Sequence, residues 1–175
     1  MEHASEKIFG WVFALSGENA ALDFAGVFLA RYLLYVLIAL FLFAALKELG
    51  WRKRLFLFIE GALAAILARG VFATAVHYFF PYPRPEETFG ISPLIESSGS
   101  AFPSGHASFL FAVATVLLYH DRRLGSWLAV GAVLNGLART FVGLHWPLDV
   151  FGGALVGIAG GVIAHLMLRP ISQKL

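Results

Sequence analysis

The chain has 175 residues, of which 59% are hydrophobic and 14% are charged, and its mean hydropathy is +0.77. Soluble domains are about 45–50% apolar, so this composition is typical of an integral membrane protein. A formal net charge of +2, without a basic tract that carries interleaved aromatic residues, argues against nucleic acid as a partner. The absence of cysteine excludes disulfides, thiolate metal ligands and a cysteine nucleophile.

Six apolar segments follow one another along the chain and predict an all-α fold. Residues 8–15 are too short to span a bilayer, so we expect an N-terminal interfacial helix with Trp11 at the headgroup level. A spanning helix needs about 20 predominantly apolar residues, and the remaining length allows about five of them. The fold class is therefore an integral membrane helical bundle, with residues 1–175 forming a single membrane-embedded domain. The predicted spans comprise residues 24–46, 55–79, 104–119, 127–144 and 147–168.

Basic residues gather in the connections between the first and second spans and between the third and fourth spans, and they also follow the fifth span. They are Lys47, Arg52, Lys53, Arg54, Arg122, Arg123, Arg169 and Lys174. The positive-inside rule assigns these connections to the cytoplasm. The proline-rich loop 81–102 and the turn 145–147 then lie on the outer face. The candidate functional residues described below lie in these connections or at the adjoining helix ends.

A histidine and an aspartate stand four residues apart where the fifth span begins. Pro147 is tolerated in a first helical turn, so His145 should lie at the mouth of the span with Asp149 one turn below it. The carboxylate can accept a hydrogen bond from one ring nitrogen and leave the other nitrogen free as a nucleophile. Burial of the charged Arg139 guanidinium in a membrane costs free energy unless it has an anionic partner. A phosphate oxygen would be such a partner. The alternative is an interfacial histidine, an aspartate helix cap and a snorkelling arginine.

The stretch Pro103-Ser104-Gly105-His106 opens the third span. The first N–H groups of a helix lack internal partners, and the helix dipole favours negative charge there. Gly105 lets a phosphate approach the backbone, and Ser104 can bind a phosphate oxygen or simply cap the helix. His106, at the same helix end, is placed to act as a general acid that protonates a leaving group.

The stretch Arg84-Pro85 lies in the stiff outer loop. Arg84 is placed to clamp a phosphate, and the neighbouring prolines reduce the entropy of holding it there. The alternative is a weak, exposed salt bridge to Glu86 or Glu87. His77, at the end of the second span, either donates a hydrogen bond to the phosphate or merely sits at the membrane interface.

The three stretches resemble, in chain order, the signature of the type 2 phosphatidic acid phosphatase (PAP2) superfamily, which reads K-x6-RP, PSGH and SR-x5-H-x3-D. The second part is complete, the third lacks only the serine before its arginine, and the first has a histidine instead of its lysine. The corresponding residues are His77, Arg84 and Pro85, then 103–106, then Ala138, Arg139, His145 and Asp149. Three spaced motifs in this order, within residues 77–149, make the resemblance specific.

The resemblance implies a metal-independent phosphatase with a phosphohistidine intermediate and no cofactor. It implies His145 as the nucleophile, Asp149 as the residue that orients it, and His106 as the general acid. The residues implied to hold the phosphoryl oxygens are Arg84, Ser104, Gly105 and Arg139, with His77 in the place of the lysine.

The resemblance also suggests a substrate and a location. Small bacterial members of the family recycle undecaprenyl diphosphate, which favours an isoprenyl diphosphate and the bacterial cytoplasmic (inner) membrane, with the active site facing the periplasm or cell exterior. Alternative substrates are phosphatidylglycerophosphate, phosphatidic acid and lipid A 1-phosphate. Two further alternatives are a lipid phosphotransferase and a non-catalytic membrane protein that binds lipid phosphate.

Several polar residues inside the spans or at their cytoplasmic ends match no motif position, and we expect them to have structural roles. They are Arg31, Glu60, Arg69, His120, Asn135 and His165. Gly153, Gly157 and Gly161 form a stripe of small residues on the fifth span, which predicts helix packing and would also suit a homodimer. The predicted partners are therefore a lipid phosphate, the bilayer and a second copy of the chain.

Overall fold

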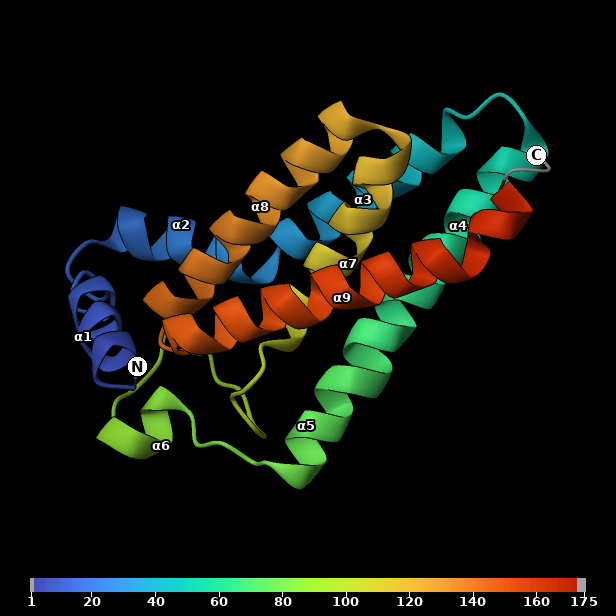
Figure 1. The fold of residues 1–175 in the computed structure, drawn as a ribbon. Coiled ribbons are helices and arrows are strands. Elements are labelled where there is room, and N and C mark those ends of the chain that lie inside the picture. Colours follow the sequence, from blue (N-terminus) through green and yellow to red (C-terminus); the bar gives the residue numbers. More distant parts are fainter. Residues whose placement is uncertain (1, 173–175) are drawn as a thin grey trace.

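The apolar segments form a bundle of helices (Figure 1). The computed structural model describes residues 2–172, and its regular elements in that range are all helical. In chain order they are α1 (Glu2–Phe13), α2 (Ala20–Arg31), α3 (Leu33–Leu46), α4 (Trp51–Ala65), the π-helix η1 (Ile66–Ala73), α5 (Thr74–Phe79), α6 (Pro85–Phe89), α7 (Gly105–His120), α8 (Arg122–Phe141) and α9 (Pro147–Ser172). The predicted all-α fold class is confirmed.

Two helical runs within the described residues are long and apolar enough to cross a membrane. One is Trp51–Phe79, which joins α4, η1 and α5, and the other is Pro147–Ile171 of α9. The helices α2 and α3 qualify as a pair but are bent by 44° relative to each other, and α7 is apolar but shorter. Two or three apolar spans fit an integral membrane protein, while the total of five spans stays a prediction.

The expected first span, residues 24–46, is divided at Tyr32 into α2 and α3. Carbonyl groups in the last turn of a helix lack intrahelical partners. Asn135 of α8 supplies partners here, because its Nδ2 donates to the carbonyl oxygens of Leu29 and Ala30 over 2.7 and 3.2 Å. The predicted span is therefore a bent pair of helices, and the break is stabilised by a side chain from elsewhere in the chain.

The helices α7 and α9 pack against each other more extensively than any other pair in the described chain. A Cβ added at Gly157 would stand 2.6 Å from the carbonyl oxygen of Ser108, and one added at Gly161 would stand 2.6 Å from Cβ of Thr115. Such close approach of two helix backbones requires small residues at the contact. The glycine stripe is therefore covered by α7 of the same chain, so it offers no support for the expected homodimer.

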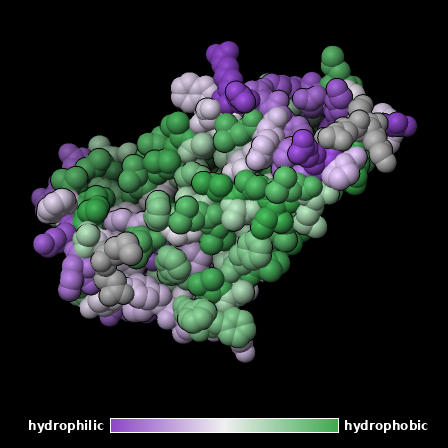
Figure 2. Space-filling model, in the orientation of Figure 1, coloured by the Kyte–Doolittle hydropathy of each residue, from purple (hydrophilic) through white to green (hydrophobic). Residues whose placement is uncertain are grey.

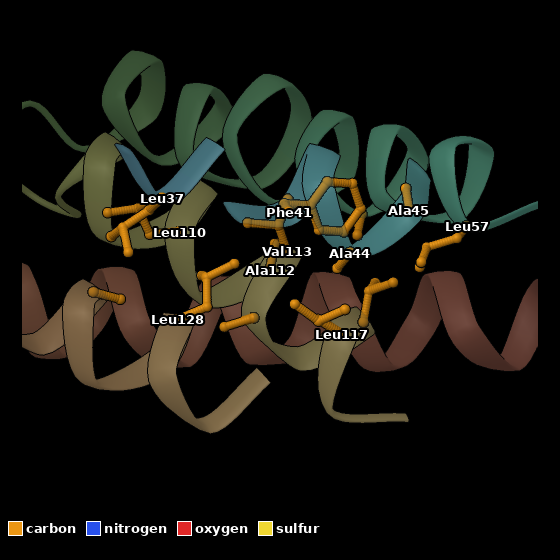
Figure 3. Packing of buried hydrophobic residues seen from close by; sticks show 14 of the residues in the cluster. Leu37, Phe41, Ala44, Ala45, Leu57, Leu110, Ala112, Val113, Leu117 and Leu128 are labelled. Atoms are coloured by element: carbon orange, nitrogen blue, oxygen red, sulfur yellow. The ribbon is translucent and has the colours of Figure 1, made fainter. Parts of the chain in front are cut away.

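An apolar core fills the space between α3, α4, α7, α8 and α9. Figure 3 shows Leu37 and Phe41 of α3 beside Leu110 and Val113 of α7, with Leu128 of α8 on the other side of α7. All five side chains are at least 93% buried. The core therefore fixes the rotation of α7, whose first turn carries part of the candidate site.

A broad apolar surface lies between two hydrophilic ends of the bundle (Figure 2). On α9, the side chains of Phe151, Leu155 and Met167 remain 60%, 54% and 59% exposed. Exposed apolar surface of this extent marks contact with a membrane or another apolar partner. At one end of the bundle, Lys47 Nζ lies 2.5 Å from Asp121 Oδ2 and joins two connections that the basic residues predict to share one side.

Replacing Gly157 with alanine should destabilise the bundle. The added methyl group would press on the Ser108 carbonyl, and overpacking of this kind costs roughly 1–3 kcal/mol. The gain from replacing glycine by alanine in a helix is only about 1 kcal/mol. Gly10→Ala in α1 is the matched control, because nothing lies within 4 Å of its added Cβ. Thermal unfolding in detergent measures both variants, and an unchanged midpoint for Gly157→Ala would contradict the close packing.

Candidate active site

The turn between α8 and α9 carries the predicted nucleophile. Gly143 adopts a φ of +87°, a left-handed conformation that glycine accepts without strain. The amide of Leu144 donates to the carbonyl of Arg139 over 3.0 Å and closes the turn. His145 follows immediately, two residues before α9 begins at Pro147. The local backbone therefore presents His145 at the mouth of α9, as the sequence predicts.

His145 and Asp149 face each other across the first turn of α9. Nδ1 of His145 lies 3.3 Å from Oδ2 of Asp149, and the same oxygen accepts the Trp146 amide over 2.8 Å. The two side chains are 3% and 1% exposed. The backbone therefore positions the carboxylate, which in turn positions the imidazole and leaves Nε2 as the nitrogen that does not contact it.

The surroundings keep His145 uncharged. Burial lowers the pKa of His145 well below its usual range, and the positive charges of Arg139 and Arg84 lower this pKa further. The backbone of Ala101 opposes the shift without reversing it. Because a neutral imidazole keeps a lone pair for attack, the same burial suits a nucleophile.

The N-terminus of α7 lies directly against the start of α9. The amide of Ser104 donates to the carbonyl of Asp149 over 2.9 Å, so two of the three motifs are joined through their backbones. Ser104 is the N-cap residue of α7, yet its Oγ makes no capping bond and is buried without a partner. The alternative of a simple helix cap is therefore not realised, and the hydroxyl is free to bind a ligand oxygen.

His106 and Arg139 line the same cavity, whose volume is about 240 Å³. The guanidinium of Arg139 is buried, and Nη1 makes a long bond of 3.4 Å to the carbonyl of Ala30, while Nε has no partner. A buried N–H and a buried hydroxyl without partners are groups that a phosphate oxygen would satisfy.

Arg84 also lies at the site, but its donors are in use. Nε and Nη1 donate to the carbonyls of Gly99 and Leu144 over 2.9 and 2.8 Å, and Nη2 makes a longer bond of 3.4 Å to the carbonyl of Ser98. Burial lowers the pKa of Arg84, and nearby carboxylates partly offset that effect. Arg84 therefore ties the outer loop to the residue before His145, and its direct contact with phosphate stays a prediction.

His77 contacts the backbone that leads into α7. Its Nε2 lies 2.8 Å from the carbonyl oxygen of Pro103, so Nε2 carries the proton in this bond. This bond ties His77 to the residue before Ser104. Its direct contact with phosphate stays a prediction.

Two arginines that were expected to be structural lie at the site. Arg69 belongs to η1, and its guanidinium lies so close to Gly105 that an added Cβ would collide with it. Arg69 lines a second cavity of about 250 Å³ with His106, and Arg31 lines the first cavity with Arg139. The available signal was an ionisable residue inside an apolar span, which is a functional candidate by default. The hydrophobic periodicity of the sequence does not predict the π-helical turn that carries Arg69, so the direction of this side chain could not be predicted.

Comparison with known proteins identifies the protein family. Residues 58–172 match the PAP2 superfamily, and the chain belongs to this superfamily. Undecaprenyl-diphosphatase BcrC of Bacillus subtilis (strain 168) is 30% identical over 173 residues, which cover 94% of this chain and 86% of that protein. The lipid A 4'-phosphatase of Bacteroides thetaiotaomicron is 26% identical over 161 residues, which cover 87% and 72% respectively.

A solved structure agrees with both the fold and the sequence match. The crystal structure of Aquifex aeolicus LpxE has a TM-score of 0.74 and 31% sequence identity, and the match covers 90% of this chain and 92% of that chain. The predicted family is therefore confirmed, and the chain is a membrane phosphatase, a hydrolase of phosphate esters.

Ser104→Ala should weaken phosphate binding without weakening the fold. Oγ of Ser104 has no partner to lose, and a buried hydroxyl without a partner costs about 1–3 kcal/mol, so the free energy of unfolding should stay at the wild-type value or rise above it. Loss of one hydrogen bond to phosphate should raise the inhibition constant of inorganic phosphate roughly tenfold. Phosphate inhibition and thermal unfolding measure the two effects.

Ser108→Ala is the matched control for this prediction. Oγ of Ser108 donates to the carbonyl of Ser104 over 3.0 Å, so its removal should lower the free energy of unfolding by about 0.5–1.5 kcal/mol. Phosphate inhibition should stay near wild type in this variant. A Ser104→Ala protein that binds phosphate as tightly as wild type would show that the hydroxyl is not a ligand.

Proposed function

We propose that this chain is a metal-independent lipid phosphatase that acts through a phosphohistidine intermediate on an isoprenyl diphosphate such as undecaprenyl diphosphate. The observation that carries the proposal is a pair of buried donors without partners beside a buried nucleophile. The donors are Ser104 Oγ and Arg139 Nε, and the nucleophile is the His145 imidazole held by Asp149. A phosphoryl group would satisfy both donors and stand next to the imidazole.

The proposed reaction consists of two displacements. Nε2 of His145 attacks the terminal phosphorus and forms a P–N bond, while the P–O bond to the leaving group breaks with its electron pair. His106 protonates the leaving oxygen, and Asp149 stabilises the positive charge on the phosphorylated ring. Water then attacks the phosphorus, His106 accepts its proton, the P–N bond breaks and inorganic phosphate leaves.

Two cavities that meet at His106 support a diphosphate on a lipid chain. Arg31 and Arg139 line the first cavity, and Arg69 lines the second. The other residues that line the second cavity are Leu34, Ile38, Gly105 and Phe109. A diphosphate carries more negative charge than a monophosphate, so three arginines around one histidine favour it, and the apolar lining suits an isoprenyl chain. The name of the Bacillus subtilis relative agrees with this substrate.

We assign the site to the outer leaflet of the bacterial cytoplasmic membrane. The pair Lys47–Asp121 lies at the end of α7 opposite Ser104, among the basic connections of the chain. The positive-inside rule makes that end cytoplasmic, so the active site faces the periplasm or the cell exterior. In this arrangement α1 lies at the outer interface with Trp11, which is 73% exposed, and the chain crosses the membrane five times.

Other lipid phosphates fit the same chemistry. Phosphatidylglycerophosphate, phosphatidic acid and lipid A 1-phosphate each present a phosphoryl group at the membrane surface, and a second lipid in place of water would make the enzyme a phosphotransferase. A non-catalytic protein that only binds lipid phosphate needs no nucleophile. The buried pair His145 and Asp149 therefore favours the enzyme.

Phosphate release from a panel of these lipids, assayed in detergent with a chelator present, tests the proposal. Activity should survive chelation and be greatest on undecaprenyl diphosphate. His145→Ala should lose at least about 10³-fold in kcat, because removal of a nucleophile leaves only residual catalysis. Rapid quenching with radiolabelled terminal phosphate should trap an acid-labile phosphoenzyme in wild type but not in His145→Ala. Equal lipid binding by both proteins, with no phosphate release from any lipid, would favour the non-catalytic binder.

Arg69→Gln should discriminate between diphosphate and monophosphate substrates. Loss of a charged hydrogen bond to the second phosphate should reduce kcat/KM for undecaprenyl diphosphate about tenfold or more, with a smaller effect on phosphatidic acid. Arg52→Gln, in the basic connection at the opposite end of the bundle, is the matched control and should leave both values unchanged. An equal loss on both substrates in Arg69→Gln would remove Arg69 as a basis for diphosphate preference.

A further inference from the structure

Three polar side chains from three helices meet at the end of the bundle away from the active site. Glu60 of α4 is fully buried, and its Oε2 lies 2.7 Å from Nε2 of His120, the last residue of α7. The other carboxylate oxygen, Oε1, lies 2.7 Å from Nδ1 of His165 on α9. None of the three residues occupies a position of the PAP2 signature, so the phosphatase reaction leaves this cluster unexplained.

A buried carboxylate loses its hydration, and hydrogen bonds or a positive charge must replace that stabilisation. Within residues 2–172, the salt-bridge partners of Glu60 are the two imidazoles. Neutral imidazoles supply hydrogen bonds but no positive charge. Because an uncompensated buried ion costs several kcal/mol, a cation between the three side chains would supply what the hydrogen bonds lack.

The three donor atoms have the chemistry and spacing of a metal site. One carboxylate oxygen and two imidazole nitrogens lie within 4.8 Å of one another. Zn²⁺ binds such donors tetrahedrally with bonds of about 2.0–2.1 Å, which corresponds to donor separations of about 3.3 Å. The two hydrogen-bonded pairs at 2.7 Å would therefore have to open by a few tenths of an ångström when an ion enters. The side chains of His120 and His165 are 26% and 20% exposed, so the cluster can be reached from outside the bundle.

Aromatic neighbours hold both imidazoles beside the carboxylate. The ring of Tyr119 stacks on that of His165, with the centroids 3.8 Å apart and the planes within 3°. Phe56 contacts the ring of His120 edge-on at a centroid distance of 6.0 Å. Such packing orients the ligand rings before an ion binds, so less conformational entropy is lost on binding.

We propose that Glu60, His120 and His165 bind one divalent transition-metal ion, for which Zn²⁺ is the best chemical match. The ligating nitrogens are Nε2 of His120 and Nδ1 of His165, and each neutral ring then carries its proton on the other nitrogen. The ion joins α4, α7 and α9. Because the 16 residues of α7 separate the cluster from Gly105 by roughly 22 Å, the ion clamps the bundle and takes no part in phosphoryl transfer.

The test uses the full chain, purified in detergent with an affinity tag that contains no histidine. After treatment with a chelator, Zn²⁺ is titrated by calorimetry, and Co²⁺ is added separately to read the coordination geometry from its visible spectrum. We expect one ion per chain, a tetrahedral Co²⁺ spectrum, and a thermal unfolding midpoint that rises with Zn²⁺. A wild-type protein that unfolds cooperatively yet binds neither ion would overturn the proposal.

Variants locate the ion. His165→Phe keeps a ring to stack on Tyr119, and His120→Phe keeps a ring beside Phe56, so each removes one ligand with little loss of packing. Each should weaken Zn²⁺ binding at least about tenfold and abolish the rise in midpoint. His3→Gln is the matched control, because His3 pairs with Glu6 on exposed α1, and it should bind Zn²⁺ as wild type does. Unchanged binding in both phenylalanine variants would overturn the proposal.

A third variant covers the case in which the phenylalanine variants do not fold. Glu60→Gln keeps the shape of the side chain and one acceptor oxygen, but it removes the negative charge and replaces the second acceptor with an NH2 donor, so it should also weaken Zn²⁺ binding. Phosphatase turnover reports the integrity of the fold independently, since chelation should lower the unfolding midpoint but leave turnover unchanged. Zn²⁺ binding of wild-type strength in an active Glu60→Gln protein would again overturn the proposal.

Discussion

The close packing of α7 on α9 is the constraint on which the candidate active site depends. A Cβ at Gly153 would stand 2.5 Å from the carbonyl oxygen of Ser104, so a larger residue there would push the two helices apart. Because residue 153 is a glycine, the helices approach closely enough for the amide of Ser104 to donate to the carbonyl of Asp149 over 2.9 Å. That single bond sets the start of α7 against the start of α9. The first turn of α7, which carries the general-acid candidate His106, therefore lies against the first turn of α9, which carries Asp149.

The site concentrates polar groups that the protein alone does not satisfy. Four buried side-chain nitrogen or oxygen atoms lack a partner among the described residues, and two of them, Ser104 Oγ and Arg139 Nε, belong to the site. Each such group costs about 1–3 kcal/mol in a folded protein. An anion that binds both would recover that energy, which is why phosphate should stabilise the fold as well as occupy the site. Arg84 illustrates the opposite arrangement, since its donors already bind three carbonyls and stiffen the loop around the cavity.

Most of the fold class and the central residues of the candidate site could be predicted from the sequence. Apolar length and composition are local properties, so they indicated an all-α membrane bundle, although not the break at Tyr32. The spacing of His145 and Asp149 places them on one helix face, and the positions of Ser104 and His106 at a helix start favour an anion. Three motifs in family order then identified the superfamily.

What the sequence by itself determined is therefore the chemistry that each segment carries and the helix end at which it lies, because these follow from residue type and from the helical period. Only the tertiary structure decided which residues meet across helices. It brought Arg69 to Gly105 through a π-helical turn, engaged the donors of Arg84 with carbonyls, and joined Glu60 to two histidines from other helices. The physical reason is that the period fixes the face on which a side chain lies, whereas its partner depends on the rotation and separation of helices, which the packing of the whole bundle sets.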